Sequence, residues 1–230
     1  MPPQAPTTAA LLMLADSRLP AGGHAHSGGL EPAVAARRVS TVDDLEVFLR
    51  GRLRTAGLVA AALAAAACAG ASRVDAEFWA ALDAEADART PSPALRSASR
   101  QQGRALLRAG RAAWPGPVLD LLAATPGGPH HPVALGAVGA AAGCEPLGVA
   151  RVAAYLSISG PASAAVRLCG FDPLAVHALL AGLAGDADRV GAEAASAADG
   201  PLPALPAAAA PVLDLLAETH ARMEVRLFAS

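Results

Sequence analysis

Residues 56–71 read AGLVAAALAAAACAGA, an apolar run of 16 residues without a charged side chain. Alanine and leucine dominate this run, and they are the apolar residues with the highest helix propensity. A membrane-spanning helix needs about 20 residues of stronger hydrophobicity, so the run predicts a helix buried in the protein core. We expect this helix to begin after a cap at Ser40 or Thr41, to bend at Gly57 and to stop at Gly70.

The rest of the chain has the same helical character. Of its 230 residues, 53% are hydrophobic and 3% are aromatic, and clusters of β-branched residues are scarce. This composition predicts an all-α fold of about ten helices in one domain covering residues 1–230. A proline-rich, linker-like stretch at residues 199–210 is expected to precede a C-terminal helix at residues 211–228. The remaining helices are expected near residues 9–15, 29–38, 72–88, 94–113, 118–124, 132–142, 146–157, 161–168, 172–184 and 186–197.

Several classes of enzyme are disfavoured by the residues that the chain lacks. All 18 basic residues are arginine, so neither a phosphate-binding lysine nor a Schiff-base lysine is present. Residues 23–30, GHAHSGGL, have the glycine spacing of a phosphate-binding loop but lack its Lys-Ser/Thr ending. The chain contains no Gly-x-Ser-x-Gly nucleophile motif. We therefore do not expect an enzyme.

Charge and cysteine usage indicate the compartment. The net charge of −2 provides no global field that would attract nucleic acid. Cys68, Cys144 and Cys169 are far apart in the sequence and predict free thiols in a reducing environment. The first residues, MPPQAP, lack the charged region of a signal peptide. A cytoplasmic protein without a membrane partner is the expectation.

Two histidine pairs could supply metal ligands. His24 and His26 would point to the same side of an extended loop, and His130 and His131 could add imidazoles of the kind that Ni²⁺ accepts. Neither pair has a cysteine or carboxylate at ligand spacing, which favours surface or hydrogen-bonded histidines over a stable metal site. A transient nickel contact at His24 and His26 remains the minority alternative.

An arginine stripe runs along the helix expected at residues 94–113. Arginines recur at positions 96, 100, 104, 108 and 111, and no acidic residue lies between Thr90 and Pro117. Like charges on one helix face cost about 0.2–0.5 kcal/mol per pair unless other groups neutralise them. The stripe is either a solvated or internally paired face, or a docking surface for an acidic partner or, less readily, for nucleic acid.

The chain ends in EVRLFAS, residues 224–230, which is an unusually apolar terminus. Such an end is either packed in the core or reserved for a partner. Arg226 could make bidentate, charge-assisted contacts there that a lysine could not reproduce, and Leu227 and Phe228 would add apolar contacts.

Five segments together resemble UreF, a family of urease accessory proteins. They are the glycine-histidine loop (RLPAGGHAHSGGLE, residues 18–31), QQGRALLR (101–108), HPVALG (131–136), AAVRL (164–168) and the tail with PVLD (211–214), His220 and RLFAS (226–230). Each segment is weak evidence alone, but the five follow the family order and span nearly the whole chain.

The resemblance implies an all-α homodimer without catalysis or a cofactor of its own. In the family, the protein binds the accessory protein UreD (UreH in some organisms), recruits the GTPase UreG and thereby delivers Ni²⁺ to apo-urease. The resemblance assigns UreG recruitment to Arg226, and places Arg167 and the loop residues His24, His26 and Glu31 near the dimer and UreG surface. Many members carry a tyrosine in the loop where this chain reads His-Ala-His.

Overall fold

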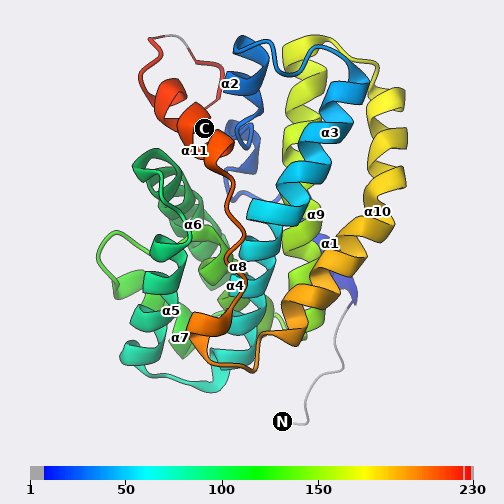
Figure 1. The fold of residues 1–230 in the computed structure, drawn as a ribbon. Helices are drawn as coiled ribbons and strands as arrows, with labels where there is room; N and C mark the ends of the chain where they lie inside the picture. The colour runs from blue at the N-terminus through cyan, green and yellow to red at the C-terminus, as the bar shows by residue number, and fades with distance from the viewer. Residues whose placement is uncertain (1–7, 225, 229–230) are drawn as a thin grey trace.

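A computed structural model describes residues 8–224 and 226–228, apart from the side chain of His24, and all regular elements within these residues are helical (Figure 1). The α-helices are α1 (Thr8–Ala15), α2 (Leu30–Ala35), α3 (Val42–Arg52), α4 (Leu58–Ala69), α5 (Ala76–Ala88), α6 (Pro93–Ala113), α7 (Pro117–Ala124), α8 (His131–Ala141), α9 (Pro146–Cys169), α10 (Pro173–Ser196) and α11 (Pro211–Ala221). Short 3₁₀ turns occur at η1 (Gly23–Ala25), η3 (Gly70–Ser72) and η4 (Leu202–Ala204). The expected all-α fold is confirmed.

Helix α4, the centre of the apolar run, lies in the middle of the core and packs against α8, α9 and α10. Its alanines let neighbouring backbones approach closely. A Cβ atom at Gly136 of α8 would collide with the carbonyl oxygen of Ala64 and the side chain of Ala67, so only glycine fits this helix crossing. The expected buried helix is confirmed.

Two helical stretches, residues 42–72 and 146–169, are long and apolar enough by length and composition alone to cross a membrane. Their most apolar windows are 61% and 50% buried inside the protein. This burial is what the core helices of a globular protein show.

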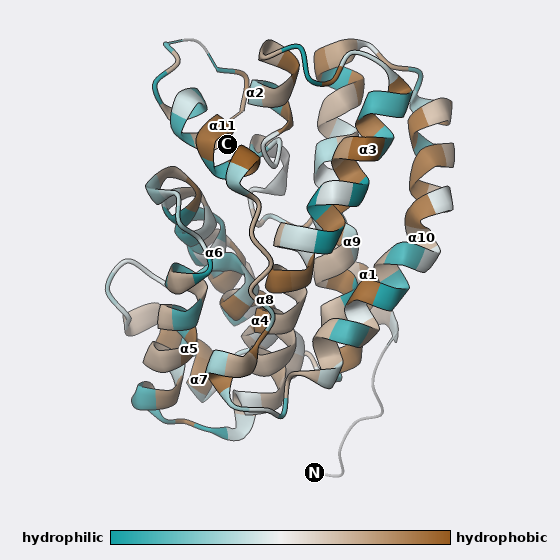
Figure 2. Ribbon diagram, viewed as in Figure 1, coloured by the Kyte–Doolittle hydropathy of each residue, from teal (hydrophilic) through white to brown (hydrophobic). Residues whose placement is uncertain are grey.

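The beginning of the long helical stretch follows the expected capping. Thr41 accepts a hydrogen bond from the backbone N–H of Asp44, whose side chain accepts one from the Thr41 backbone. This capping box satisfies two otherwise unpaired donors. At Gly57, where the sequence predicts a bend, a π-helical turn, η2 (Leu53–Gly57), joins α3 to α4. In Figure 2, α3 shows alternating brown and teal bands, as a helix with one face on the core does.

Helix α9 is one helix, not the two that Pro161 led us to expect. Proline lacks an N–H group and therefore leaves the carbonyl four residues earlier, that of Ser157, without its helical donor. The Nε of Arg52 donates to this carbonyl at 2.9 Å. A side chain from α3 thus replaces the missing hydrogen bond and lets the helix continue.

Two further boundaries differ from the expectation. Helix α10 runs unbroken through Gly185, because Leu183, Ala187 and Val190 are buried around it and packing outweighs the roughly 1 kcal/mol propensity cost of a glycine. Helix α5 begins after Asp75 rather than Ser72, since Asp75 accepts a hydrogen bond from the backbone of Glu77. Proline stands in the first turn of each helix from α6 to α11, as its fixed φ angle favours.

The C-terminal helix is shorter than expected, because α11 ends at Ala221 and not near residue 228. The backbone amides of Leu227 and Phe228 donate to a side chain from another part of the chain and not to the preceding turn. Figure 1 shows the red C-terminal segment beside the blue α2, at the opposite end of the sequence, and α11 contacts both α2 and α6.

Candidate functional site

The glycine-histidine loop ends in a buried carboxylate. Gly28 and Gly29 have positive φ angles of 62° and 88°, which turn the chain sharply before α2 begins. A side chain at Gly28 would collide with Pro161 and crowd Arg52, so glycine lets the loop lie directly on α9. The turn places Glu31 in the first turn of α2, where it is only 8% exposed.

Glu31 binds the C-terminal tail. Its carboxylate accepts hydrogen bonds from the backbone N–H of Leu227 at 2.7 Å and of Phe228 at 3.0 Å. It also lies 2.8 Å from Nε2 of His220, a ring that is 2% exposed. We call these four residues the tail clasp. One carboxylate therefore joins two segments separated by 189–197 positions in the sequence.

The tail is divided between a buried and an exposed part. The Phe228 ring is buried and lies under the guanidinium of Arg167, 4.7 Å from the ring centroid, at the distance of a cation–π contact. Leu227 is 75% exposed and Arg226 is also exposed. Of the two expected fates of the apolar terminus, packing holds for Phe228, whereas a partner for the exposed Arg226 and Leu227 stays a prediction.

Two further attachments hold the C-terminal region before the tail. Arg89, which pairs with Glu85, donates to the carbonyls of the linker, with Nε 2.9 Å from Pro206 and Nη2 2.8 Å from Leu205. The Glu218 carboxylate of α11 accepts hydrogen bonds from the Ser92 hydroxyl and from the Ala94 backbone, at the beginning of α6. The linker is consequently tied to α5, and α11 is tied to α6.

A cavity of about 410 Å³ lies behind the loop, between α1, α8 and α9. His26, His131, Arg52 and Arg167 contribute to its wall. Burial lowers the pKa of His131 to about 4, with the nearby His26 as a second cause, and burial also lowers the pKa of His26. Both imidazoles are therefore neutral at pH 7. The side chain of His24 lies outside the described atoms, so the geometry of the expected His24/His26 pair stays a prediction.

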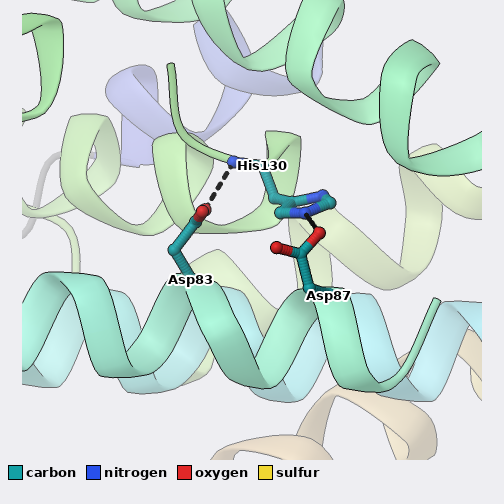
Figure 3. Close-up of side chains that lie close together, drawn as sticks. All are labelled: Asp83, Asp87 and His130. Carbon is teal, nitrogen blue, oxygen red and sulfur yellow. Dashed lines mark hydrogen bonds and ion pairs between the residues drawn. The ribbon is translucent and has the colours of Figure 1, made fainter. Parts of the chain in front are cut away.

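The side chain of His130 does not lie in the cavity wall with that of His131. The His130 side chain is 1% exposed and points toward α5, where Nε2 lies 2.9 Å from Asp87 and the backbone N–H donates to Asp83 (Figure 3). These three residues have the ligand types of a metal site. Arg100 already pairs with both carboxylates, at 2.7 and 2.8 Å. Arg96, 3.8 Å from Asp87, is a second cation beside the cluster. The cluster is therefore an ion-pair network, and the histidines of the adjacent pair face different surroundings.

The arginine stripe of α6 is largely engaged inside the molecule. Within the described residues, two of its arginines form ion pairs, Arg100 with Asp83 and Asp87 and Arg111 with Asp120. Two others donate hydrogen bonds to backbone carbonyls, Arg96 to Thr90 and Pro91 and Arg104 to Gly127. Of the two interpretations of this stripe, internal pairing accounts for these four arginines. A docking surface on this face would compete with bonds that already exist.

Sequence reasoning missed Arg52, Arg89 and His220 as organising residues. Pro161 inside an apolar helical pattern was the one available signal, because it implies a carbonyl that needs a donor. No local pattern indicates that the donor is Arg52, or that His220 lies within hydrogen-bond distance of Glu31, because these contacts join distant segments.

Fold and site together define an all-helical protein whose N-terminal loop and C-terminal tail are built into one surface. Residues 39–184 match the model of the UreF family. A urease accessory protein UreF of Mycobacterium sp. (strain JLS) is 49% identical over 224 residues, 97% of this chain and 99% of the relative. UreF of Mycobacterium marinum is 46% identical over the same shares, and UreF of Mycobacterium tuberculosis H37Rv is 41% identical over 96% and 98%.

The chain belongs to the UreF family of urease accessory proteins. Its role is therefore in urease maturation, as an accessory protein and not as an enzyme. The comparisons extend over 97% of the chain and therefore well beyond residues 39–184.

Proposed function

We propose that this protein is a cytoplasmic scaffold for nickel insertion, which binds UreD (UreH) and recruits the GTPase UreG to apo-urease. The family membership supports the maturation role, and the resemblance described above supplies the partners. In this proposal the protein has no cofactor of its own, and Ni²⁺ is cargo in transit. The tail and the glycine-histidine loop form the surface that UreG recognises.

The tail clasp is the observation that carries the assignment of the surface. Glu31 fixes the backbone at Leu227 and Phe228 while Arg226 and Leu227 remain exposed. Arginine is one of the residue types enriched among the anchors of protein interfaces, and here the backbone next to it is held by two hydrogen bonds. Preorganisation lowers the entropy that binding costs.

The test is capture of purified UreG by a preformed complex of this protein with UreD. We expect Arg226→Ala to reduce capture by about tenfold or more, which corresponds to the loss of one charge-assisted contact. Arg222→Ala is the matched control, because Arg222 is also exposed and lies four positions earlier. The circular dichroism spectrum and thermal stability of both variants should equal those of the wild type.

Equal capture by the Arg226→Ala variant and the wild type would contradict the role of Arg226. Removal of residues 227–230 is a less specific test, since it also deletes the buried Phe228 ring. Retention of UreD binding together with loss of UreG capture is the expected pattern for a defect in the recruiting surface.

We also propose that the protein is a homodimer through the surface shared by α1 and α9. Leu12 and Met13 of α1 are 66% and 50% exposed, and Leu147 and Tyr155 of α9 are 39% and 43% exposed. Exposed apolar side chains that gather on adjacent helices are typical of interaction sites. Leu12→Glu should lower the mass found by sedimentation equilibrium, whereas Val47→Glu, at an equally exposed valine of α3, should leave it unchanged.

A transient nickel contact at His24 and His26 is the remaining part of the proposal. His26 is neutral at pH 7 because burial lowers its pKa, and a neutral imidazole is the form that binds metal. Calorimetry should show weaker nickel binding by a His24→Ala/His26→Ala double variant than by the wild type. Identical binding isotherms for the wild type and the double variant would show that this loop does not bind nickel.

A further inference from the structure

Arg52 occupies an unusual place in the wall of the cavity behind the loop. It lies at the end of α3, and its Nε is committed to the Ser157 carbonyl of α9. The guanidinium is close to the backbone of Gly28, where a side chain would crowd its Cζ atom. The rest of the guanidinium is thus held in a fixed position between the loop and α9.

The cation of Arg52 has no counter-ion within the described part of the chain. No carboxylate there lies within ion-pair distance of it, and its one hydrogen bond is made by Nε. Every fully buried side-chain nitrogen or oxygen in the same residues has a partner. The terminal nitrogens Nη1 and Nη2, which have none, are therefore not fully buried, and Arg52 is a wall residue of the cavity.

The charges around the cavity favour an anion. Arg167 lines the same space. Asp16 is the one acidic residue among the described lining residues, and it is already paired with Arg18 at 2.7 Å. Burial lowers the pKa of Arg52 to about 10, which means that its charged form lacks the solvation it would have in water. A bound anion would restore that stabilisation.

The dimensions of the cavity suit a small ligand. Its volume of about 410 Å³ lies in the range of pockets for small molecules. Leu14, Leu106 and Leu135 form apolar wall on the side of α1, α6 and α8. The neutral ring of His131 can donate one hydrogen bond without adding charge.

We propose that this cavity binds a small oxyanion, a phosphate or an organic carboxylate, whose oxygens accept hydrogen bonds from Nη1 and Nη2 of Arg52. The planar fork of a guanidinium matches two oxygens of such a group. Arg167 adds positive charge from the α9 side, and the leucines accommodate the apolar part of a carboxylate ligand. Arg226 and Leu227 are not among the residues that line this cavity, so the proposal goes beyond partner recruitment.

The test is titration of the full chain with inorganic phosphate and, separately, with butyrate, at constant ionic strength by calorimetry. Arg52→Gln is the informative variant, because the glutamine Nε stands at the same bond position as the arginine Nε. It can therefore keep the hydrogen bond to Ser157 while the terminal nitrogens and the charge are lost. Arg54→Gln, at an exposed arginine two residues away, is the matched control.

We expect saturable binding by the wild type and by Arg54→Gln, and at least about tenfold weaker binding by Arg52→Gln. Tighter binding of butyrate than of phosphate would identify a carboxylate ligand, and the reverse order a phosphate. If Arg52→Gln fails to fold, Arg167→Gln provides the same test from the other wall, with weaker binding expected. No saturation by either anion at about 10 mM, or equal binding by the wild type and the folded variants, would overturn the proposal.

Discussion

Replacement of Glu31 by glutamine should release the C-terminal tail while leaving the helical body intact. Glutamine has nearly the same shape as glutamate, but it has one acceptor oxygen instead of two and no charge. The carboxylate of Glu31 accepts from the backbone N–H of Leu227 and Phe228 through different oxygens and also meets His220. At least one of these contacts must be lost, and the remaining ones become neutral hydrogen bonds.

The size of the effect follows from these contacts. A hydrogen bond to a charged group contributes about 1.5–3 kcal/mol net, and a neutral one about 0.5–1.5 kcal/mol. The two tail amides can bind water once released, so their loss costs no more than this net contribution. We therefore expect the docked state of the tail to lose about 2 kcal/mol, or roughly a 30-fold shift toward the released state.

Amide hydrogen exchange measured by NMR is the direct assay, because the two amides report on their own bonds. Exchange at Leu227 and Phe228 should accelerate about 30-fold in Glu31→Gln, with little change in α4. Glu46→Gln is the matched control, since Glu46 forms a half-exposed pair with Arg50 on α3. Less than about a threefold change at the two tail amides, or equal acceleration in the control, would refute the clasp.

Three further predictions concern the fold that supports this surface. Arg89→Ala should lower the free energy of unfolding, measured in urea, by about 2–3 kcal/mol. Arg89→Lys should recover less than half of that loss, because an ammonium group cannot reach several carbonyls in one plane. Full recovery by lysine would contradict this geometry. Gly136→Ala should destabilise the folded protein by about 1–2 kcal/mol, although alanine has the better helix propensity. Gly182→Ala, in open space on α10, should stabilise it by about 1 kcal/mol. A gain of stability from Gly136→Ala would show that the helices can separate. His131 has a pKa of about 4 in the folded protein against about 6.5 in the unfolded chain. Between these two pH values the unfolded chain therefore binds more protons than the folded protein. The free energy of unfolding should consequently fall by up to about 3 kcal/mol as the pH drops from 6.5 to 4. The unfolding free energy of His131→Gln, measured over the same pH range, should fall less steeply than that of the wild type; parallel profiles would exclude the titration of His131.

Local sequence patterns were sufficient for the fold class and for most helices. Alanine-rich runs and a cap at Ser40 or Thr41 act within a few residues, and the structure confirms the buried helix and places the cap at Thr41. The patterns were insufficient where a distant group changed the local preference. Pro161 should end a helix by local rules, but Arg52 supplies a donor from 105 positions away. The amides of Leu227 and Phe228, beyond the end of α11, donate to Glu31 and not to a continuing helix.

The same limit applies to the candidate surface. The apolar terminus indicated that Phe228 would be either packed or reserved for a partner, but nothing in EVRLFAS indicated which. The outcome depends on Glu31 and Arg167, which lie on α2 and α9. The resemblance had grouped these residues near one surface without any contact between them. The structure supplies the contacts, and the partner roles of the residues stay predictions.

The three attachments of the C-terminal region predict the order in which it can open. Arg89 holds the linker and Glu218 holds α11, and neither bond involves a residue beyond Ala221. Among the described residues, Leu227 and Phe228 reach the body through Glu31 and Arg167. Among the described residues of α11, His220 is the one that hydrogen-bonds to Glu31, so the tail can detach while the linker and most of α11 remain in place. Binding of a partner at Arg226 therefore need not unfold α11.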